Sequence, residues 1–502
     1  MTDTATYLGQ KGYTIHKKNI CVKEQQFIRD ELMVKPYMPK SPVQPPAFPV
    51  YRESSSKLYI PRFFGIETYG DPDEMHITHG DPINIKFNGD LRDYQQNIIH
   101  TYLKHVNTNR DNGGGGSLEI PCGRGKTVMA LKLIEQLKTK TLVIVHKSFL
   151  LDQWIERIEQ FLPDARVGKI QGQIIDIDDK DIVIGMLQSL SMKEYPQSMF
   201  KSFGFTIVDE CHHISSEVFS RSLLKIVTKY VLGLSATMQR KDGLTKVFKM
   251  FLGEIIYKEK RDATDEVLVK AVEYKTNDEE FNEVIYDYRG NPQYSSMITK
   301  LCTYNQRCEF IIQVLSNELK IYPEQQVMIL GQNKNILVYL HKAIEHRNIA
   351  SVGFYVGGMK KDDLKNSESK KVIIATYAMA AEALDIKSLT TLFLVTPRTD
   401  ITQAVGRILR VKHKRPLVVD FVDTHKVFKN QWNKRRKFYE KNKYKTIYTD
   451  NKGYLKDIWN TIYDPTNTAK KCKKLVKTNN PNTSVNNDLD GIPKGKCLIN
   501  LS

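Results

Sequence analysis

The stretch Pro121-Cys122-Gly123-Arg124-Gly125-Lys126-Thr127 decides how this chain folds. Its two glycines let consecutive backbone N–H groups turn inward, because no Cβ stands in the way. Lys126 can then place its ammonium between the β- and γ-phosphates of a nucleoside triphosphate, and the Thr127 hydroxyl can ligate magnesium. The general pattern G-x-x-x-x-G-K-[ST] has a glycine where this chain has Ile120. The stretch therefore predicts a phosphate-binding loop that leads into the N-terminus of a helix over Val128–Leu137.

Two carboxylates, Asp209 and Glu210, follow the short apolar run Phe205–Val208. Such a run is typical of a buried parallel strand, and open α/β sheets bind ligands at the carboxyl ends of their strands. We expect Asp209 to hold magnesium and Glu210 to orient and deprotonate the attacking water. A solvated acidic pair is the alternative for this segment taken alone. Its position after a phosphate loop favours hydrolysis of a nucleoside triphosphate.

The composition indicates a multidomain protein with a polyanionic partner. The chain has 502 residues, a formal net charge of +18 and a pI of about 9.3, which favours nucleic acid as the partner. Its seven cysteines are scattered and form no C-x-x-C pair, so neither a zinc ribbon nor a disulfide framework is predicted. We expect an intracellular, reducing compartment. No apolar run is long enough for a membrane span, and Met1–Thr4 does not begin a signal peptide.

Strand-like and helix-like segments alternate through the middle of the chain, which predicts parallel sheets covered by helices. The expected strands of a first domain are Ser117–Ile120, Thr141–Val145, Ile182–Gly185, Thr206–Val208 and Val231–Ser235. Those of a second domain are Val327–Leu330, Val372–Ala375, Thr391–Val395 and Leu417–Val422. The run Asn112–Gly116 is expected to be a flexible loop before the first strand. The expected fold class is α/β, with an N-terminal accessory domain (1–88), two tandem parallel-sheet domains (89–260 and 270–425) and a basic, partly disordered C-terminal tail (426–502).

Two segments mix aromatic and basic residues. Tyr51–Gly65 either stacks on bases and grips phosphates or forms the packed edge of a small domain, and the second interpretation is slightly favoured. Residues 426–502 hold 18 Lys and Arg against 6 Asp and Glu, so they carry +12 of the chain's +18. Their aromatic residues are interleaved with this charge: Trp432, Phe438, Tyr439 and Tyr444. We expect this tail to bind phosphates, with a solubilising or localising tail as the alternative.

Four further segments accompany the two motifs, one before the phosphate loop and three after the acidic pair. They are Leu91-Arg92-Asp93-Tyr94-Gln95, Ser235-Ala236-Thr237, Glu382-Ala383-Leu384-Asp385 and Gln403-Ala404-Val405-Gly406-Arg407-Ile408-Leu409-Arg410. The ordered series resembles the motif set of superfamily 2 helicases over residues 90–425. The resemblance implies two tandem RecA-like domains, ATP and magnesium as cofactors, and a nucleic acid partner.

The resemblance also implies roles for single residues. Gln95 looks like the glutamine that reads adenine, while Ser235 and Thr237 look like the link between the ATP site and domain motion. Asp385 resembles the residue that couples the second domain to the nucleotide, and Gln403 resembles a γ-phosphate contact. Arg407 and Arg410 resemble arginine fingers. These two are three residues apart and therefore share a helix face, and guanidinium groups suit phosphate. A capped strand end is the alternative for the pair Ser235 and Thr237.

Within the superfamily, the acidic motif of this chain is Asp-Glu-Cys-His rather than Asp-Glu-Ala-Asp. The segments that look most like the XPB-type DNA translocases are Leu91–Gln95, Pro121–Thr127 and Arg240-Lys241-Asp242-Gly243. That group has an acidic residue where this chain has Lys241, so a role tied to that acid is not carried over. The stretch Tyr51–Gly65 looks like the poxvirus-type transcript-release helicases of large DNA viruses. This likeness implies a role in viral transcription, in the host cytoplasm and the virion.

The candidate nucleic-acid contacts are polar groups at strand ends, which line the carboxyl edge of a parallel sheet. The favoured ones are His146, Lys147 and Gln188, and the further ones are Trp154, Arg398 and Thr402. The leading function is an ATP-dependent helicase or translocase on DNA, acting with transcription machinery. The alternatives are an RNA helicase or RNA-dependent ATPase, a restriction-type motor subunit, and a non-catalytic nucleic-acid-binding scaffold.

Overall fold

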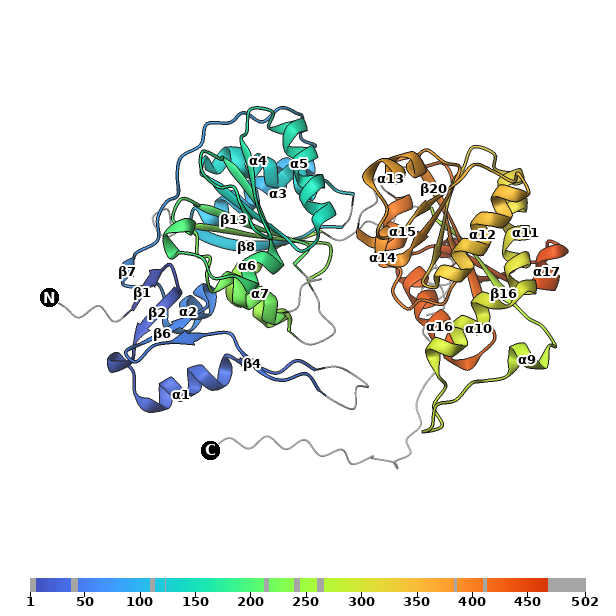
Figure 1. Ribbon diagram of the computed structural model, residues 1–502, viewed down its shortest axis with the longest axis horizontal. Helices are drawn as coiled ribbons and strands as arrows, with labels where there is room; N and C mark the ends of the chain where they lie inside the picture. The colour runs from blue at the N-terminus through green and yellow to red at the C-terminus, as the bar shows by residue number, and fades with distance from the viewer. Residues whose placement is uncertain are drawn as a thin grey trace, which may run out of the picture.

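The computed structural model describes residues 6–37, 44–108, 113–121, 123–211, 216–238, 244–259, 266–382, 386–409 and 413–467. These residues form two lobes that lie side by side (Figure 1). The first lobe contains a small N-terminal sheet and a large parallel sheet, and the second lobe contains another large sheet. Within the described residues, no helix is both long and apolar enough to cross a membrane.

The N-terminal unit is a five-stranded sheet of order β5-β6-β2-β1-β7 with two helices. Its elements are β1 (Thr6–Gly9), β2 (Gly12–His16), α1 (Val22–Glu31), β3 (Met33–Val34), β4 (Phe48–Pro49), β5 (Arg52–Glu53), β6 (Lys57–Ile60), α2 (Arg62–Tyr69) and β7 (Glu74–Met75). Apolar side chains of β1, β2 and β6 belong to one continuous buried cluster with side chains of the large sheet behind them. The unit is therefore packed onto the first domain through a shared core.

The first domain is an eight-stranded, mainly parallel sheet of order β11-β10-β12-β9-β13-β14-β8-β15. Its strands are β8 (Gly114–Glu119), β9 (Thr141–Val145), β10 (Val167–Gln171), β11 (Ile174–Ile175), β12 (Ile182–Met186), β13 (Phe205–Asp209), β14 (Tyr230–Ser235) and β15 (Ile255–Lys258). One face packs against α3 (Asp93–Val106), α4 (Lys126–Leu137) and α5 (Ser148–Phe161). The other face packs against α6 (Leu187–Met192), α7 (Ser216–Leu223) and α8 (Thr245–Leu252), and it continues into the N-terminal unit.

The glycine run before the phosphate loop is not a flexible loop within its described part. Gly114, Gly115 and Gly116 begin strand β8 and pair with β14. A Cβ on Gly115 would lie 2.4 Å from a ring carbon of Phe63 and 2.9 Å from the Leu252 carbonyl oxygen. The prediction was wrong because these glycines serve close packing, which a local turn signal does not reveal.

The second domain is also an eight-stranded sheet, of order β18-β19-β17-β20-β21-β16-β22-β23. Its strands are β16 (Leu268–Tyr274), β17 (Gln326–Gly331), β18 (Val352–Tyr355), β19 (Val372–Thr376), β20 (Leu389–Leu394), β21 (Leu417–Asp423), β22 (Lys445–Asp450) and β23 (Asn460–Tyr463). One face is covered by α10 (Tyr294–Thr303), α11 (Asn305–Ile321) and α12 (Lys334–His346), with α9 (Glu279–Asn282) and α17 (Asn451–Leu455) beside them. The other face is covered by α14 (Tyr377–Glu382), α15 (Thr402–Ile408) and α16 (Lys426–Lys441), with α13 (Lys361–Glu368) at one edge.

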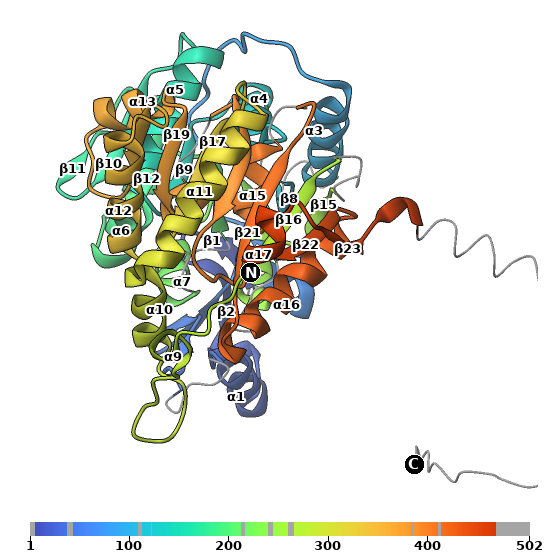
Figure 2. The same cartoon turned by 90° about the vertical axis from the view of Figure 1, so that its right-hand side faces the viewer.

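The boundary expected at residue 426 runs through this sheet. Strand β22 pairs with β16 in parallel, and β23 pairs with β22 (Figure 2). The aromatic residues expected in a basic tail are core residues instead: Trp432, Tyr439 and Tyr444 are at most 6% exposed. Arg435 forms a two-pronged buried ion pair with Asp420, which also accepts a hydrogen bond from the Tyr439 hydroxyl. Only residues 468–502 of the expected tail lie outside the described residues.

Candidate functional site

The phosphate loop connects β8 to α4 and depends on two left-handed glycines. Gly123 has φ 82° and Gly125 has φ 81°, a region that favours glycine. A Cβ on Gly125 would also lie 2.3 Å from the Gln95 amide nitrogen. No described side chain caps the N-terminus of α4, so its first N–H groups remain available to an anion. The expected strand, loop and helix are therefore present, although Cys122 lies outside the described residues.

An ion pair connects the phosphate loop to the acidic motif. The Lys126 ammonium lies 2.8 Å from Glu210 Oε1, and the two side chains are only 10% and 19% exposed. Lys126 begins α4 and Glu210 follows β13, so the two motifs meet at the carboxyl edge of the sheet. Residues 84 positions apart in sequence thus come together as expected.

Asp209 is buried at the end of β13 and is held from two sides. Its Oδ2 accepts a hydrogen bond of 2.9 Å from the Trp154 indole N–H, and its Oδ1 accepts one of 2.9 Å from the Glu210 backbone N–H. Burial raises the pKa of Asp209 to about 6, and the charge of Glu210 adds to this, while Lys126 and the Trp154 hydrogen bond act against it. A carboxylate in this setting gains from a nearby cation.

The donor atoms here suit magnesium. A carboxylate from Asp209 and a hydroxyl from Thr127 are hard oxygen ligands, and magnesium commonly takes one or two protein carboxylates while substrate phosphates and water complete its shell. Among the described residues, no cluster of three or more His, Cys, Asp or Glu forms an independent metal site. The residues therefore fit a metal that is held jointly with a nucleotide.

The backbone turns sharply after Asp209. Glu210 has φ 47°, a left-handed conformation that is strained for a residue with a side chain. Next to it, Cys211 is fully buried, and burial raises the pKa of its thiol. Cys211 is therefore a packing residue. The turn aims the Glu210 side chain at Lys126.

Gln95, the residue expected to read adenine, lies beside the backbone of Arg124. Its carbonyl accepts hydrogen bonds of 3.1 Å from both the Gln95 amide and the Tyr94 hydroxyl. The guanidinium of Arg124 stacks 4.0 Å from the Tyr94 ring centroid, and its Nε donates to Glu259 Oε1 at 2.8 Å. Sequence reasoning found Gln95 but missed Tyr94 and Glu259. Tyr94 adjoins Gln95 in the motif, whereas Glu259 lies 135 residues from Arg124 and carries no local signal.

Ser235 and Thr237 form a small turn beside the phosphate loop. The Ser235 hydroxyl donates to the Thr237 carbonyl at 2.6 Å and accepts from the Thr237 N–H at 3.2 Å. The Ser235 carbonyl accepts from the Ile120 N–H at 2.8 Å, directly before the loop. This geometry is that of a capped strand end, and it also connects the strand end to the phosphate loop.

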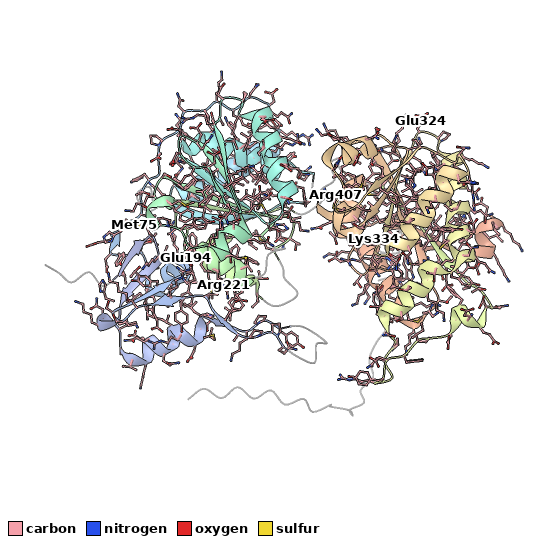
Figure 3. The ribbon with its side chains drawn as sticks, viewed as in Figure 1. Met75, Glu194, Arg221, Glu324, Lys334 and Arg407 are labelled. Atoms are coloured by element: carbon pink, nitrogen blue, oxygen red, sulfur yellow. The ribbon has the colours of Figure 1, made fainter. Side chains whose placement is uncertain are left out.

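The second domain presents α15 toward the first. Figure 3 labels Arg407 at the side of the second lobe that faces the first lobe. Arg407 is 5% exposed, and its Nε donates to the Ala380 carbonyl of α14 at 2.7 Å. Gln403 lies on the same short helix and is partly buried. Arg410 and Asp385, the other predicted residues of this side, lie outside the described residues.

Comparisons with known proteins show the family of this chain. Residues 88–240 match the family model described as Type III restriction enzyme, res subunit. A protein of Acanthamoeba polyphaga mimivirus, provisionally named ATP-dependent RNA helicase L396, is 34% identical over 484 residues, which cover 94% of this chain and 91% of that protein. The chain belongs to the superfamily 2 helicases of large DNA viruses.

Other relatives place this ATP-dependent helicase in a wider group. The protein provisionally named helicase 161L of Invertebrate iridescent virus 6 is 29% identical, over 72% of this chain and 83% of that one. The DNA 3'-5' translocase XPB2 of Sulfurisphaera tokodaii is 26% identical, over 67% of this chain and 82% of that one. A solved structure of Dbp5 from S. cerevisiae, bound to RNA and ADP BeF3, has a TM-score of 0.50 at 12% identity and covers 76% of this chain and 93% of that one. The last likeness concerns the fold, two tandem RecA-like domains.

The helicase places most of its expected nucleic-acid contacts at strand ends. His146 and Lys147 follow β9, and the exposed Gln188 follows β12. Arg398 and Thr402 are exposed in the second domain. The prediction for Trp154 was wrong: it is 1% exposed and its indole holds Asp209 instead. A helix position after a strand end does not reveal which side of the helix faces the core.

Proposed function

We propose that this helicase is an ATP-driven motor that moves along DNA during viral transcription, where it displaces a bound strand or protein. The observation that carries the proposal is the contact of Lys126 with Glu210 at 2.8 Å beside the buried Asp209. Such an arrangement brings a phosphate-binding cation, a base and a metal ligand to one strand edge. The scaffold alternative is disfavoured because none of these groups is lost from the chain.

The first step concerns the partner of Lys126. When the triphosphate enters, Lys126 exchanges the Glu210 carboxylate for the β- and γ-phosphates. Glu210 is then free to accept a proton from the attacking water, at Oε1 or Oε2. Asp209 and Thr127 would hold magnesium, which supplies charge neutralisation between the phosphates when bound. Trp154 keeps the Asp209 carboxylate oriented throughout.

The second step concerns domain closure. Arg407 and Arg410 would bring positive charge to the γ-phosphate when the second domain closes on the first, with Gln403 beside them. In related chemistry an arginine finger contributes on the order of 10³–10⁵ in rate. Because the arginines and the phosphate loop belong to different domains, hydrolysis would release the closed state. Repeated closure on a bound strand produces stepping, with Ser235 and Thr237 between the loop and the sheet end.

DNA is the proposed track because the motif forms are those of the XPB-type group and because a relative matched over 82% of its length is named a DNA translocase. The second candidate is an RNA helicase, favoured by the name of the mimivirus relative. The proposed setting is the host cytoplasm and the virion of a large DNA virus, in contact with transcription machinery.

Displacement of a third strand separates the two candidates. A labelled oligonucleotide bound as a triplex on duplex DNA is released by a DNA translocase but not by an RNA helicase. We expect ATP-dependent release by the full chain and none by Glu210→Gln. Unwinding of a tailed RNA duplex without triplex release would support the RNA helicase instead. Activity on neither substrate would contradict the motor proposal.

A further inference from the structure

The N-terminal sheet has two faces of opposite character. In β6, Leu58 and Ile60 are fully buried in the shared core, whereas Lys57 and Tyr59 are partly exposed. Side chains alternate between the faces of a strand, so the second pair points to the opposite face. Tyr7 of β1 follows the same rule, because its neighbour Leu8 is buried. The aromatic and basic stretch of the sequence therefore divides into packing residues and surface residues.

The outer face carries a row of aligned side chains. Tyr7 is opposite Thr14 of β2, Thr14 is opposite Tyr59, and Tyr59 is opposite Arg52 of β5. Neighbouring strands are about 4.8 Å apart, so the two tyrosines stand about 10 Å apart, with a small threonine between them. Thr14 is fully buried, whereas both tyrosine rings are partly exposed, and each ring can receive one base of a single strand.

Cations accompany both rings. The Lys57 ammonium lies 5.0 Å from the Tyr7 ring centroid and 3.1 Å from its hydroxyl, and the Lys11 ammonium lies 5.0 Å from the Tyr59 centroid. The His16 and His76 rings flank Tyr7, with centroids 6.1 and 4.7 Å away. Each lysine has a flexible stem, so its ammonium can move from the ring to a phosphate while a base takes the ring face.

The acidic groups nearby are already engaged. Glu74 accepts from His76 at 2.7 Å, and Asp73 accepts from the Thr6 N–H and hydroxyl at 2.8 and 3.0 Å. Glu53 is paired with Lys17 at 2.9 Å and with Arg29 at 3.0 Å, which lowers the pKa of its carboxyl. Five Lys and Arg side chains stand against these three carboxylates, so the face has a net positive charge: Lys11, Lys17, Arg29, Arg52 and Lys57.

The sheet is fixed to the motor by the residue after Pro61. Arg62 is 5% exposed and donates to the Thr228 and Lys229 carbonyls of the first domain at 3.0 and 2.9 Å. Helix α2 contacts both β2 of the N-terminal sheet and α8 of the first domain. A nucleic-acid strand that binds to the outer face of the N-terminal sheet would move with the first domain while the second domain opens and closes.

We propose that this row is a second nucleic-acid site that binds a single strand outside the motor. Bases stack on Tyr7 and Tyr59, and the phosphates pair with Lys11, Lys57 and Arg52. The inference rests on the proposed function, since a motor on nucleic acid is the setting in which one displaced strand or transcript must be held.

The test is binding of a labelled 20-nucleotide oligo-dT to the full chain without ATP, by fluorescence anisotropy at several salt concentrations. Tyr7→Ala with Tyr59→Ala is expected to raise the Kd at least tenfold with little change in salt slope. Lys11→Gln with Lys57→Gln is expected to raise the Kd several-fold and to reduce the slope by about 1.4, because each phosphate contact on a single strand contributes about 0.7.

Two matched variants separate the site from general effects. Lys23→Gln with Lys35→Gln removes the same charge from exposed positions on and after α1 of the same unit, and we expect wild-type binding. Tyr7→Phe with Tyr59→Phe keeps the rings and should keep the affinity. Equal losses in both lysine pairs, or wild-type affinity in the alanine pair, would overturn the proposal. An equal loss for a blunt duplex in the alanine pair would overturn the single-strand assignment.

The readout does not depend on the motor. Binding is measured without ATP, so a helicase that fails to displace a triplex can still show or lack this site. Unstimulated ATPase activity and thermal unfolding identify a variant that has lost its fold. Should the alanine pair unfold, the lysine pair, which leaves both rings in place, decides the question.

Discussion

Asp209 is a buried carboxylate whose surroundings disfavour its charged form. It is 6% exposed, its oxygens are held by Trp154 and its own neighbour, and Glu210 adds a second negative charge. A pKa raised from 3.8 to about 6 means that the folded state binds a proton more tightly than the unfolded state. As the pH rises from 3.8 to about 6, the contribution of Asp209 to the free energy of unfolding falls. At neutral pH this contribution is unfavourable to the folded state.

Asp209→Asn should therefore stabilise the protein at pH 7.5 while abolishing hydrolysis. The expected gain in unfolding free energy is roughly 1–3 kcal/mol, and it should shrink as the pH falls below about 6 and approach zero below about pH 3, where the Asp209 carboxyl is protonated in both the folded and the unfolded state. Thermal unfolding between pH 4 and pH 8 measures it. Asp450→Asn is the control of opposite sign, because the Gly453 N–H and Lys275 lower the pKa of that carboxyl. A less stable Asp209→Asn at pH 7.5 would contradict the assigned environment.

For single residues, the sequence predicts those contacts that follow from a short motif. The ion pair of Lys126 with Glu210 follows from two short motifs of known geometry. The sequence does not predict the partners of Asp209 and Arg124. Trp154 is 55 residues from Asp209 in sequence, and Glu259 is 135 residues from Arg124. Their identity depends on how helices and strands pack, which no motif records.

Among the elements, strands with a continuous apolar run were predictable, whereas edge strands and strands interrupted by charged residues were not. All nine strands expected in the two large sheets are present, since continuous apolar runs such as Thr141–Val145 are buried on both faces. The other seven strands of the two sheets were missed: β10, β11, β15, β16, β18, β22 and β23. In β16 the run is broken by Lys270, which pairs in the interior with Glu318 at 2.6 Å. A charged residue that forms a buried ion pair interrupts the apolar run, so the hydrophobic pattern no longer indicates a strand.

The glycines of β8 give a direct test at this scale. Gly115→Ala places a Cβ 2.4 Å from the Phe63 ring and 2.9 Å from the Leu252 carbonyl oxygen. Relief of the second contact requires the backbone to move. We expect a loss of about 1–3 kcal/mol in unfolding free energy, measured by urea denaturation. Gly357→Ala meets no atom within 4 Å and serves as the control. An unchanged Gly115→Ala would mean that the N-terminal unit does not pack on this strand.

At the scale of the whole molecule, both ends of the chain belong to the motor more closely than composition indicates. The N-terminal unit shares its core with the first domain, and residues 426–463 complete the sheet of the second. Of the +12 carried by residues 426–502, only +5 lies beyond residue 467, with 7 Lys against 2 Asp. Composition marks charge but does not show which charged segments also contribute core residues.

Two truncations separate these roles. Ending the chain at residue 467 should leave thermal unfolding unchanged, weaken nucleic-acid binding and flatten its salt dependence. Ending it at residue 425 should unfold the second domain, because Trp432, Tyr439 and Tyr444 leave its core and Asp420 loses Arg435. Circular dichroism and binding at several salt concentrations distinguish them. A folded second domain in the shorter chain would contradict the observed sheet.

We expect Lys126, Asp209 and Glu210 to form an ATP site whose turnover is driven by nucleic acid. The most direct measurement is the steady-state ATPase rate of the full chain with no nucleic acid, duplex DNA, single-stranded DNA and single-stranded RNA, beside Lys126→Ala and Glu210→Gln. We predict stimulation by DNA that falls by at least about 10²-fold in both variants, while oligonucleotide binding persists. Hydrolysis that survives in Lys126→Ala, or a rate that no nucleic acid changes, would contradict the account.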